Sequence, residues 1–309
     1  MWFLYALAAT LAWGAADLFY KKSATEERYS HLKTTIVVGL AMGIHAVVTL
    51  IFSGVEYNPI NIIRYAPVSM LYILSMIVGY FGLRYLELSV SSPVQNTSGA
   101  LVCILCVLVL KQRLDTISIV AVALMCGGVF LLGMLDHKKR KELVSPSDRK
   151  YRISMIAFLM PVIYCILDAG GTFFDAYYLD DFATTPLVGV TEESLETVAN
   201  LSYELTFLLV AVVLFVYVVL IKKQPLKVTG QGNRAAAAVF ETAGQFLYVY
   251  AMSGKAVVAA PMIASYSIVS VILGRLFLKE KLTGWQYVTV ALVMAGIALL
   301  GLAEGLAGE

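Results

Sequence analysis

The chain alternates between long apolar runs and short polar connectors. Ten apolar runs of about twenty residues can be drawn, each long enough to cross the hydrocarbon core of a bilayer as one helix. They lie near residues 2–20, 34–53, 67–87, 91–110, 115–134, 153–174, 200–221, 234–252, 256–278 and 284–302. A helix forms its backbone hydrogen bonds within one segment, as a bilayer requires. The pattern therefore predicts an all-α integral membrane protein with ten transmembrane helices.

Part of this pattern occurs twice. The stretch Tyr80–Gly133 recurs at Tyr248–Gly301 under a constant offset of 168 residues, without a gap. The match includes residues other than apolar ones: Pro93 with Pro261, Lys111 with Lys279, and Gly128 with Gly296. Duplication of an odd number of spans inverts the second copy in the membrane, as in many secondary transporters. We predict two inverted five-helix repeats, residues 1–134 and 153–309, joined by a basic cytoplasmic linker at 135–152.

Composition supports a membrane protein and excludes several alternatives. The chain is 60% hydrophobic and 14% charged, whereas soluble domains carry about 25% charged residues. A net charge of +2 gives no indication of a nucleic-acid partner. The four cysteines lie in apolar runs, so no disulfide framework is expected, and Cys103-x-x-Cys106 lacks the second pair that a metal site needs. The first run opens at Trp2 without a charged segment and is interpreted as a retained span.

Connector charges predict an orientation. Lys and Arg concentrate in alternate connectors, at residues 21–33, 84, 138–152, 222–234 and 279–281. The positive-inside rule makes these connectors cytoplasmic and both termini extracytoplasmic. The connector after the sixth span, which carries Asp175, Asp180 and Asp181 and no Lys or Arg, then faces outside. We expect a multi-pass plasma-membrane protein. A monomer is sufficient, because both repeats are in one chain, and a homodimer is left open.

Several motifs resemble a known family. Trp13-Gly14 stands near the end of the first span, and Pro93 and Pro261 open the fourth and ninth, where we expect first-turn prolines. Charged motifs ending in Leu follow those spans: Lys111-Gln112-Arg113-Leu114 and Lys279-Glu280-Lys281-Leu282. The chain thus resembles the EamA-type transporters of the drug/metabolite transporter superfamily. This resemblance implies ten spans in two halves and transport of amino acids, sugars, amines or drugs, without a cofactor.

Ionisable residues inside predicted spans are the first candidates for a substrate or proton site, because burying them in a membrane is costly. Asp168 precedes Ala169-Gly170-Gly171, whose small side chains allow either close backbone approach or a break in the helix. His45, in the middle of the second span, is interpreted as either a hydrogen-bonded core residue or a proton relay.

Two further acids have competing interpretations. Glu241 shares a helix face with Gln245 and Tyr248 and would line a cavity, unless it pairs with Arg234. Asp17 either pairs at the surface with Lys21, four residues on, or serves as a gate. Glu204, near the start of the seventh span, is expected at the interface.

Further candidates lie at equivalent places in the two repeats. Polar residues follow both prolines for about a turn, where lipid would not accept them. The candidates from these stretches and from the aromatic positions are Gln95, Asn96, Tyr266, Tyr80, Tyr248 and Trp13, the last from the family resemblance.

The sequence favours a secondary transporter that moves a small hydrophilic metabolite, such as an amino acid, amine or sugar, by alternating access. Two intramembrane acids without an intramembrane base favour a cationic or zwitterionic substrate, and protons are a further candidate partner. A drug exporter and a non-transporting sensor or scaffold are the alternatives. No phosphate-binding loop, clustered His set or hydrolase motif occurs, so we expect neither an enzyme nor a bound metal.

Overall fold

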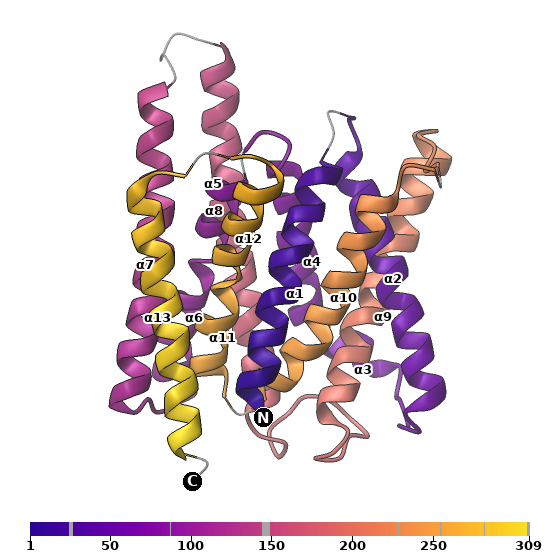
Figure 1. Ribbon diagram of the computed structural model, residues 1–309. Helices are drawn as coiled ribbons and strands as arrows, with labels where there is room; N and C mark the ends of the chain where they lie inside the picture. Colours follow the sequence, from indigo (N-terminus) through magenta and orange to yellow (C-terminus); the bar gives the residue numbers. More distant parts are fainter. Residues whose placement is uncertain are drawn as a thin grey trace.

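The computed structural model describes residues 1–24, 27–86, 88–143, 149–227, 229–253, 255–280 and 282–307. Within these ranges the regular elements are all helices (Figure 1). They are α1 (Trp2–Ser23), α2 (Ser30–Phe52), α3 (Ile60–Arg64), α4 (Ala66–Gly82), α5 (Leu88–Gln95), α6 (Ser98–Leu108), α7 (Thr116–Leu143), α8 (Arg149–Asp180), α9 (Leu195–Phe215), the π-helix η1 (Val216–Ile221), α10 (Gly232–Met252), α11 (Ala256–Ala264), α12 (Tyr266–Phe277) and α13 (Gly284–Ala307).

The described helices have the character of a membrane protein. Six helical segments are long and apolar enough to cross a bilayer, and three shorter apolar helices accompany them. Large apolar side chains point outward, as for Ile44 at 67% exposed and Val213 at 66% exposed. Such a surface suits lipid and not water. The all-α membrane fold is confirmed, and the count of ten spans stays a prediction.

The helices pack in a pattern that survives exchange of the two halves. Helix α1 packs on α10, as α4 packs on α8, while α2 packs on α9 and α7 on α13. Likewise α6 packs on α11, as α5 packs on α12. Both termini lie at one end of the bundle, and the end of α7 and the start of α8 lie at the other (Figure 1). The inverted repeat and its boundaries stay predictions, and the exchangeable packing favours them.

Pro93 and Pro261, which match between the two repeats, do not start helices, so that prediction is wrong. Pro93 lies inside α5, which begins at Leu88, and Pro261 lies inside α11, which begins at Ala256. An interior proline removes one helical hydrogen bond and crowds the preceding turn. Each helix ends within a few residues, α5 at Gln95 and α11 at Ala264, and a second helix then continues. Two discontinuous helices therefore meet near the centre of the bundle.

The charged motifs of the two repeats have the same backbone form. Lys111 and Lys279 have positive φ angles of 58° and 57°. The next amide in each motif reaches back six residues: Gln112 N–H donates to Cys106 O over 3.2 Å, and Glu280 N–H donates to Gly274 O over 3.3 Å. This arrangement closes a helix C-terminus. Lys281, the third residue of the second motif, lies outside the described residues.

The side chains of these motifs cap helices of the opposite half. Val257 N–H, in the first turn of α11, donates to Gln112 Oε1 over 2.9 Å. Leu88 N–H, the first of α5, donates to Glu280 Oε1 over 3.1 Å. First-turn amides of a helix have no partner within it, so these bonds stabilise the starts of both discontinuous helices. We call the pair the reciprocal caps.

Candidate functional site

A cavity lies at the centre of the bundle, where the discontinuous helices meet α1, α4, α8, α9 and α10. About 770 Å³ of space within it, including space open to solvent, is not occupied by atoms. Ten of the eleven side chains predicted as binding candidates line it, and His45 is the exception. They are Trp13, Asp17, Tyr80, Gln95, Asn96, Asp168, Glu241, Gln245, Tyr248 and Tyr266. The structure thus brings these residues together, and their role in binding stays a prediction.

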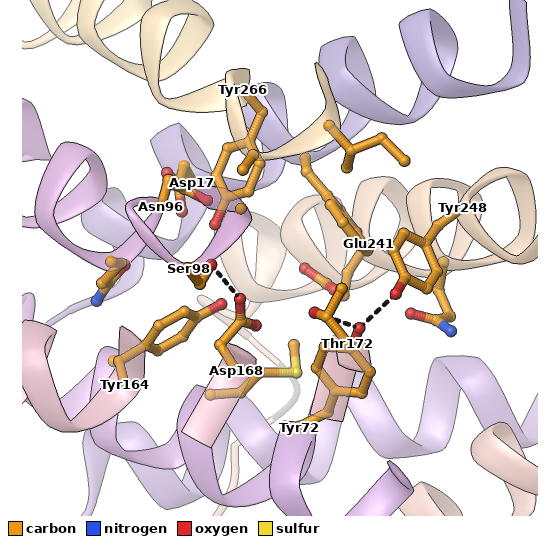
Figure 2. A pocket seen from close by; sticks show the side chains of 18 of the residues that line it. Asp17, Tyr72, Asn96, Ser98, Tyr164, Asp168, Thr172, Glu241, Tyr248 and Tyr266 are labelled. Atoms are coloured by element: carbon orange, nitrogen blue, oxygen red, sulfur yellow. Dashed lines mark hydrogen bonds between the residues drawn. The ribbon is translucent and has the colours of Figure 1, made fainter. Parts of the chain in front are cut away.

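Asp168 projects from α8 into the cavity and accepts a hydrogen bond from Ser98 Oγ on α6 over 2.7 Å (Figure 2). Its side chain is partly accessible, whereas Asp17 and Glu241 are buried. The glycines that follow it allow close packing and not a helix break. A Cβ at Gly171 would lie 3.2 Å from the ring of Tyr72, and α8 continues to Asp180.

Asp17 is held between the two discontinuous helices. Its Oδ2 accepts hydrogen bonds from Ser92 Oγ on α5 over 2.6 Å and from Ser270 Oγ on α12 over 2.7 Å. The surface pair with Lys21 is therefore wrong. The ammonium of Lys21 donates instead to the carbonyl groups of Leu83 and Leu86, over 2.8 and 2.5 Å.

Glu241 accepts a hydrogen bond from the hydroxyl of Tyr20 on α1 over 2.9 Å. The alternative pairing with Arg234 is wrong. The guanidinium of Arg234 donates to Thr34 Oγ1 and Ser30 Oγ on α2, over 3.2 and 2.9 Å. Glu241 is free of this ion pair because α1 lies against α10 and presents a hydroxyl to it.

Aromatic side chains and hydroxyls form much of the wall. Tyr72 joins Tyr248 over 2.6 Å and Thr172 over 2.7 Å through its hydroxyl (Figure 2). The Trp13 ring lies 5.1 Å from that of Tyr248 and 5.9 Å from that of Tyr266, measured between centroids. The wall thus offers both π-faces and hydroxyl groups to a ligand.

Three buried polar atoms that belong to the lining have no hydrogen-bond partner among the described residues: Trp13 Nε1, the Tyr80 hydroxyl and Gln95 Nε2. Buried donors are normally satisfied, and an unsatisfied one costs about 1–3 kcal/mol. Their position in the cavity wall makes them available to a ligand.

The cavity is acidic. Its lining includes Asp17, Asp168 and Glu241, and no Lys, Arg or His is among the residues that line it. Carboxyl groups at this depth need a cation, a proton or hydrogen-bond donors to stabilise them. Nothing in the described wall supplies a positive charge.

His45 lies outside this cavity. Its Nδ1 lies 2.8 and 2.9 Å from the two carboxyl oxygens of Glu204 on α9. Glu204 is fully buried between the helices, and its interfacial position stays a prediction. His45 is therefore hydrogen bonded, but its side chain is 34% exposed and does not belong to the core, so its role as a proton relay stays a prediction. Sequence alone did not suggest the pair because the two residues are 159 positions apart.

One acid was misplaced from the sequence. Asp175 was assigned to an external connector, but α8 extends to Asp180 and Asp175 is fully buried in it. It accepts a hydrogen bond from the Tyr65 hydroxyl. The spacing of Asp168, Thr172 and Asp175 fits one helix face and was the available signal. The tyrosines at 20, 72, 164 and 203 were also missed, because aromatic residues in apolar runs are usually core.

Comparisons with known proteins agree with this fold. The model of the EamA-like transporter family matches residues 1–134 and 183–302. No curated protein sequence matches the chain. One solved crystal structure is 16% identical, covers 97% of this chain and 96% of its own, and superposes with a TM-score of 0.61. At that identity the likeness establishes the fold alone. The family match spans most of the chain, which therefore belongs to the EamA-like transporter family of the drug/metabolite transporter superfamily.

Proposed function

We propose that this membrane transporter is a secondary transporter of small organic cations, and that its cavity binds the cation by charge and by aromatic contact. The observation that carries this proposal is that the cavity wall contains three carboxyl groups and no basic side chain. A cation in the cavity would supply the missing positive charge. An anionic or phosphorylated substrate would instead require buried Lys or Arg.

Aromatic rings reinforce the preference for a cation. Trp and Tyr faces attract ammonium groups, an effect worth about 0.5–2 kcal/mol and greatest where water is excluded. The Trp13 ring lies 5.1 Å from that of Tyr248 and 5.9 Å from that of Tyr266. Tyr248 and Tyr266 lie across the cavity from Asp168 (Figure 2). Carboxyl and ring together favour an amine or a quaternary ammonium.

The unpartnered donors narrow the ligand further. Gln95 Nε2 and the Tyr80 hydroxyl can donate to an oxygen of the substrate. The best fit is a small cation with a hydroxyl or carbonyl group, such as an amino alcohol or an amino-acid derivative with net positive charge. A neutral sugar would satisfy the donors and leave the carboxyl groups without a counter-charge.

Alternating access would use the two halves and their discontinuous helices, which all border the cavity. No nucleotide-binding motif occurs in the sequence, so the energy would come from a gradient, with protons as the coupling candidate. The proposal places the protein in the plasma membrane with extracytoplasmic termini and involves no cofactor or enzymatic step.

The test is ligand-dependent stabilisation of the purified protein. Choline and putrescine would represent cations, glucose a neutral ligand and succinate an anion. A ligand that binds only the folded state raises the melting temperature. We expect the cations alone to do so, and uptake of the best cation into proteoliposomes to follow. Stabilisation by succinate or glucose alone would contradict the proposal.

Asp168→Asn tests the role of the most accessible carboxyl. We expect the affinity for the cation to fall about 100-fold, because a desolvated charge pair contributes roughly 2–5 kcal/mol. Asp180→Asn on the same helix is the matched control. Asp180 accepts from Gln112 through one carboxyl oxygen, a contact that Asn retains, and it does not line the cavity.

A further inference from the structure

Asp175 is a buried acid that the cavity does not use. It lies on α8 with none of its surface exposed and is absent from the cavity lining. One carboxyl oxygen accepts a hydrogen bond from Tyr65. The other, Oδ2, has no hydrogen-bond partner among the described residues. A buried carboxyl group with an unpartnered oxygen is costly to the fold, which suggests a functional role.

Two tyrosine hydroxyls lie between Asp175 and the cavity. Tyr72 and Tyr248 belong to the cavity lining, and their hydroxyls are 2.6 Å apart. Both side chains also lie close enough to Asp175 to interact with its carboxyl electrostatically. The two hydroxyls therefore connect the cavity wall with the carboxyl. Hydroxyl groups can pass a proton along such a connection, whereas an organic cation would have to displace them.

Asp175 and Asp168 share one face of α8. Residues seven apart on a helix return to the same side and are separated by about 10 Å along the axis. Thr172 lies between them and hydrogen bonds to Tyr72 over 2.7 Å. The two acids are thus held by one rigid element at a distance over which charges still interact in a protein interior.

No base faces Asp175 from the described elements around it. The titratable groups that interact with it are Tyr65 before α4, Tyr72 on α4, Tyr203 on α9 and Tyr248 on α10. Asp168 and Asp180 are the other acids on its own helix. Without Lys, Arg or His in this set, a proton is the positive charge that fits a site with no accessible surface.

We propose that Asp175 is the coupling proton site of this transporter, separate from the carboxyl groups that bind the substrate. The inference rests on the proposed cation transport. A cation at Asp168 and a proton on Asp175 are two positive charges about 10 Å apart, so each weakens the binding of the other roughly tenfold. Because of this coupling, the transporter would exchange protons for cations across the membrane.

The experiment measures uptake of radiolabelled choline, or of the panel cation that stabilises the protein most, into proteoliposomes with and without an imposed pH gradient. We expect the gradient to drive accumulation by the wild type at least fivefold above the level without it. Asp175→Asn should lose this stimulation and keep both cation-dependent stabilisation and cation exchange. Asp180→Asn, the same substitution on the same helix, should behave as wild type.

A second variant guards against misfolding of Asp175→Asn. Tyr65→Phe removes only the hydroxyl that donates to the carboxylate, so the pH of half-maximal uptake should move upward with folding preserved. Full gradient stimulation in Asp175→Asn would overturn the proton site. Loss of both the stimulation and cation binding in this variant would also overturn it. Wild-type uptake that ignores the gradient would overturn it too and leave cation transport standing. Failure of every cation to bind would instead refute the proposed function itself.

Discussion

The two discontinuous helices share a backbone break and differ in what surrounds it. The pair α5 and α6 carries buried polar side chains at the break: Ser91, Ser92, Gln95, Asn96 and Ser98. In α11 every buried residue from Ala256 to Ile263 is apolar, and polar groups begin only at Ser265. The repeat therefore supplies the same scaffold twice, while the side chains suited to recognising a hydrophilic ligand lie mainly on the first copy.

Packing explains why the second copy is apolar. Helix α11 lies against α6, and Gly99 allows the approach, since a Cβ there would lie 2.6 Å from that of Ala264 and 3.1 Å from the Pro261 Cα. A polar side chain at this contact would have no room for a partner. One discontinuous helix thus serves as a packing surface and the other as the polar wall.

The largest expected effect comes from breaking this contact. Gly99→Val would force atoms against the backbone of α11, and overpacking of this kind costs about 1–3 kcal/mol. We expect a clear fall in melting temperature together with loss of ligand-dependent stabilisation. The control is Gly127→Val in α7, because no atom lies within 4 Å of the Cβ position at Gly127. Equal destabilisation of both variants would contradict the role of the contact.

The reciprocal caps offer a second comparison, because the two motifs differ in charge. Gln112→Glu would keep the acceptor for Val257 N–H but remove the donor to Asp180 and place two acids together. We expect the free energy of unfolding to fall by about 1–2 kcal/mol, because the carboxylate of Asp180 loses its hydrogen-bond donor. Glu280→Gln keeps the acceptor for Leu88 and should change the melting temperature less. A larger fall in melting temperature for Glu280→Gln than for Gln112→Glu would contradict this account of the two caps.

The smallest effect sharpens the difference in lining. Gln95 and Ile263 occupy equivalent positions in the two repeats. Gln95→Leu would remove an amide whose Nε2 has no hydrogen-bond partner among the described residues, so the fold should be retained. Affinity for an oxygen-bearing cation should fall about 3–10-fold, the contribution of one neutral hydrogen bond. Ile263→Leu should leave the affinity unchanged, and titration calorimetry compares the two. An unchanged affinity in Gln95→Leu would remove Gln95 from the site.

Much of this fold is present in the sequence as periodic signals. Apolar runs reveal the helices, and the matched Pro, Lys and Gly positions reveal the duplication. Acids in apolar runs, such as Asp168 and Glu241, stand out because membranes disfavour them. Three acids selected in this way, Asp17, Asp168 and Glu241, line the cavity together with seven candidates chosen on other grounds.

The missed features depend on contacts between distant segments. Asp175 stands at the end of an apolar run, and only the packing of α8 against α4 shows that the helix continues and buries it. The burial of Glu204 could not be expected from its own segment, because its partner His45 lies on another helix. Pro93 was misplaced because Ser91 and Ser92 read as a helix start, whereas the cap at Leu88 comes from Glu280 in the other repeat.

The reciprocal caps have a consequence for how the protein is made. Helix α5 belongs to the first half, yet the side chain that caps it, Glu280, is synthesised almost two hundred residues later, 192 positions beyond Leu88. During biosynthesis the polar wall of the cavity therefore remains incomplete until the second half has entered the membrane. If the gene were split between the repeats, each half alone would lack the side chain that caps its own discontinuous helix.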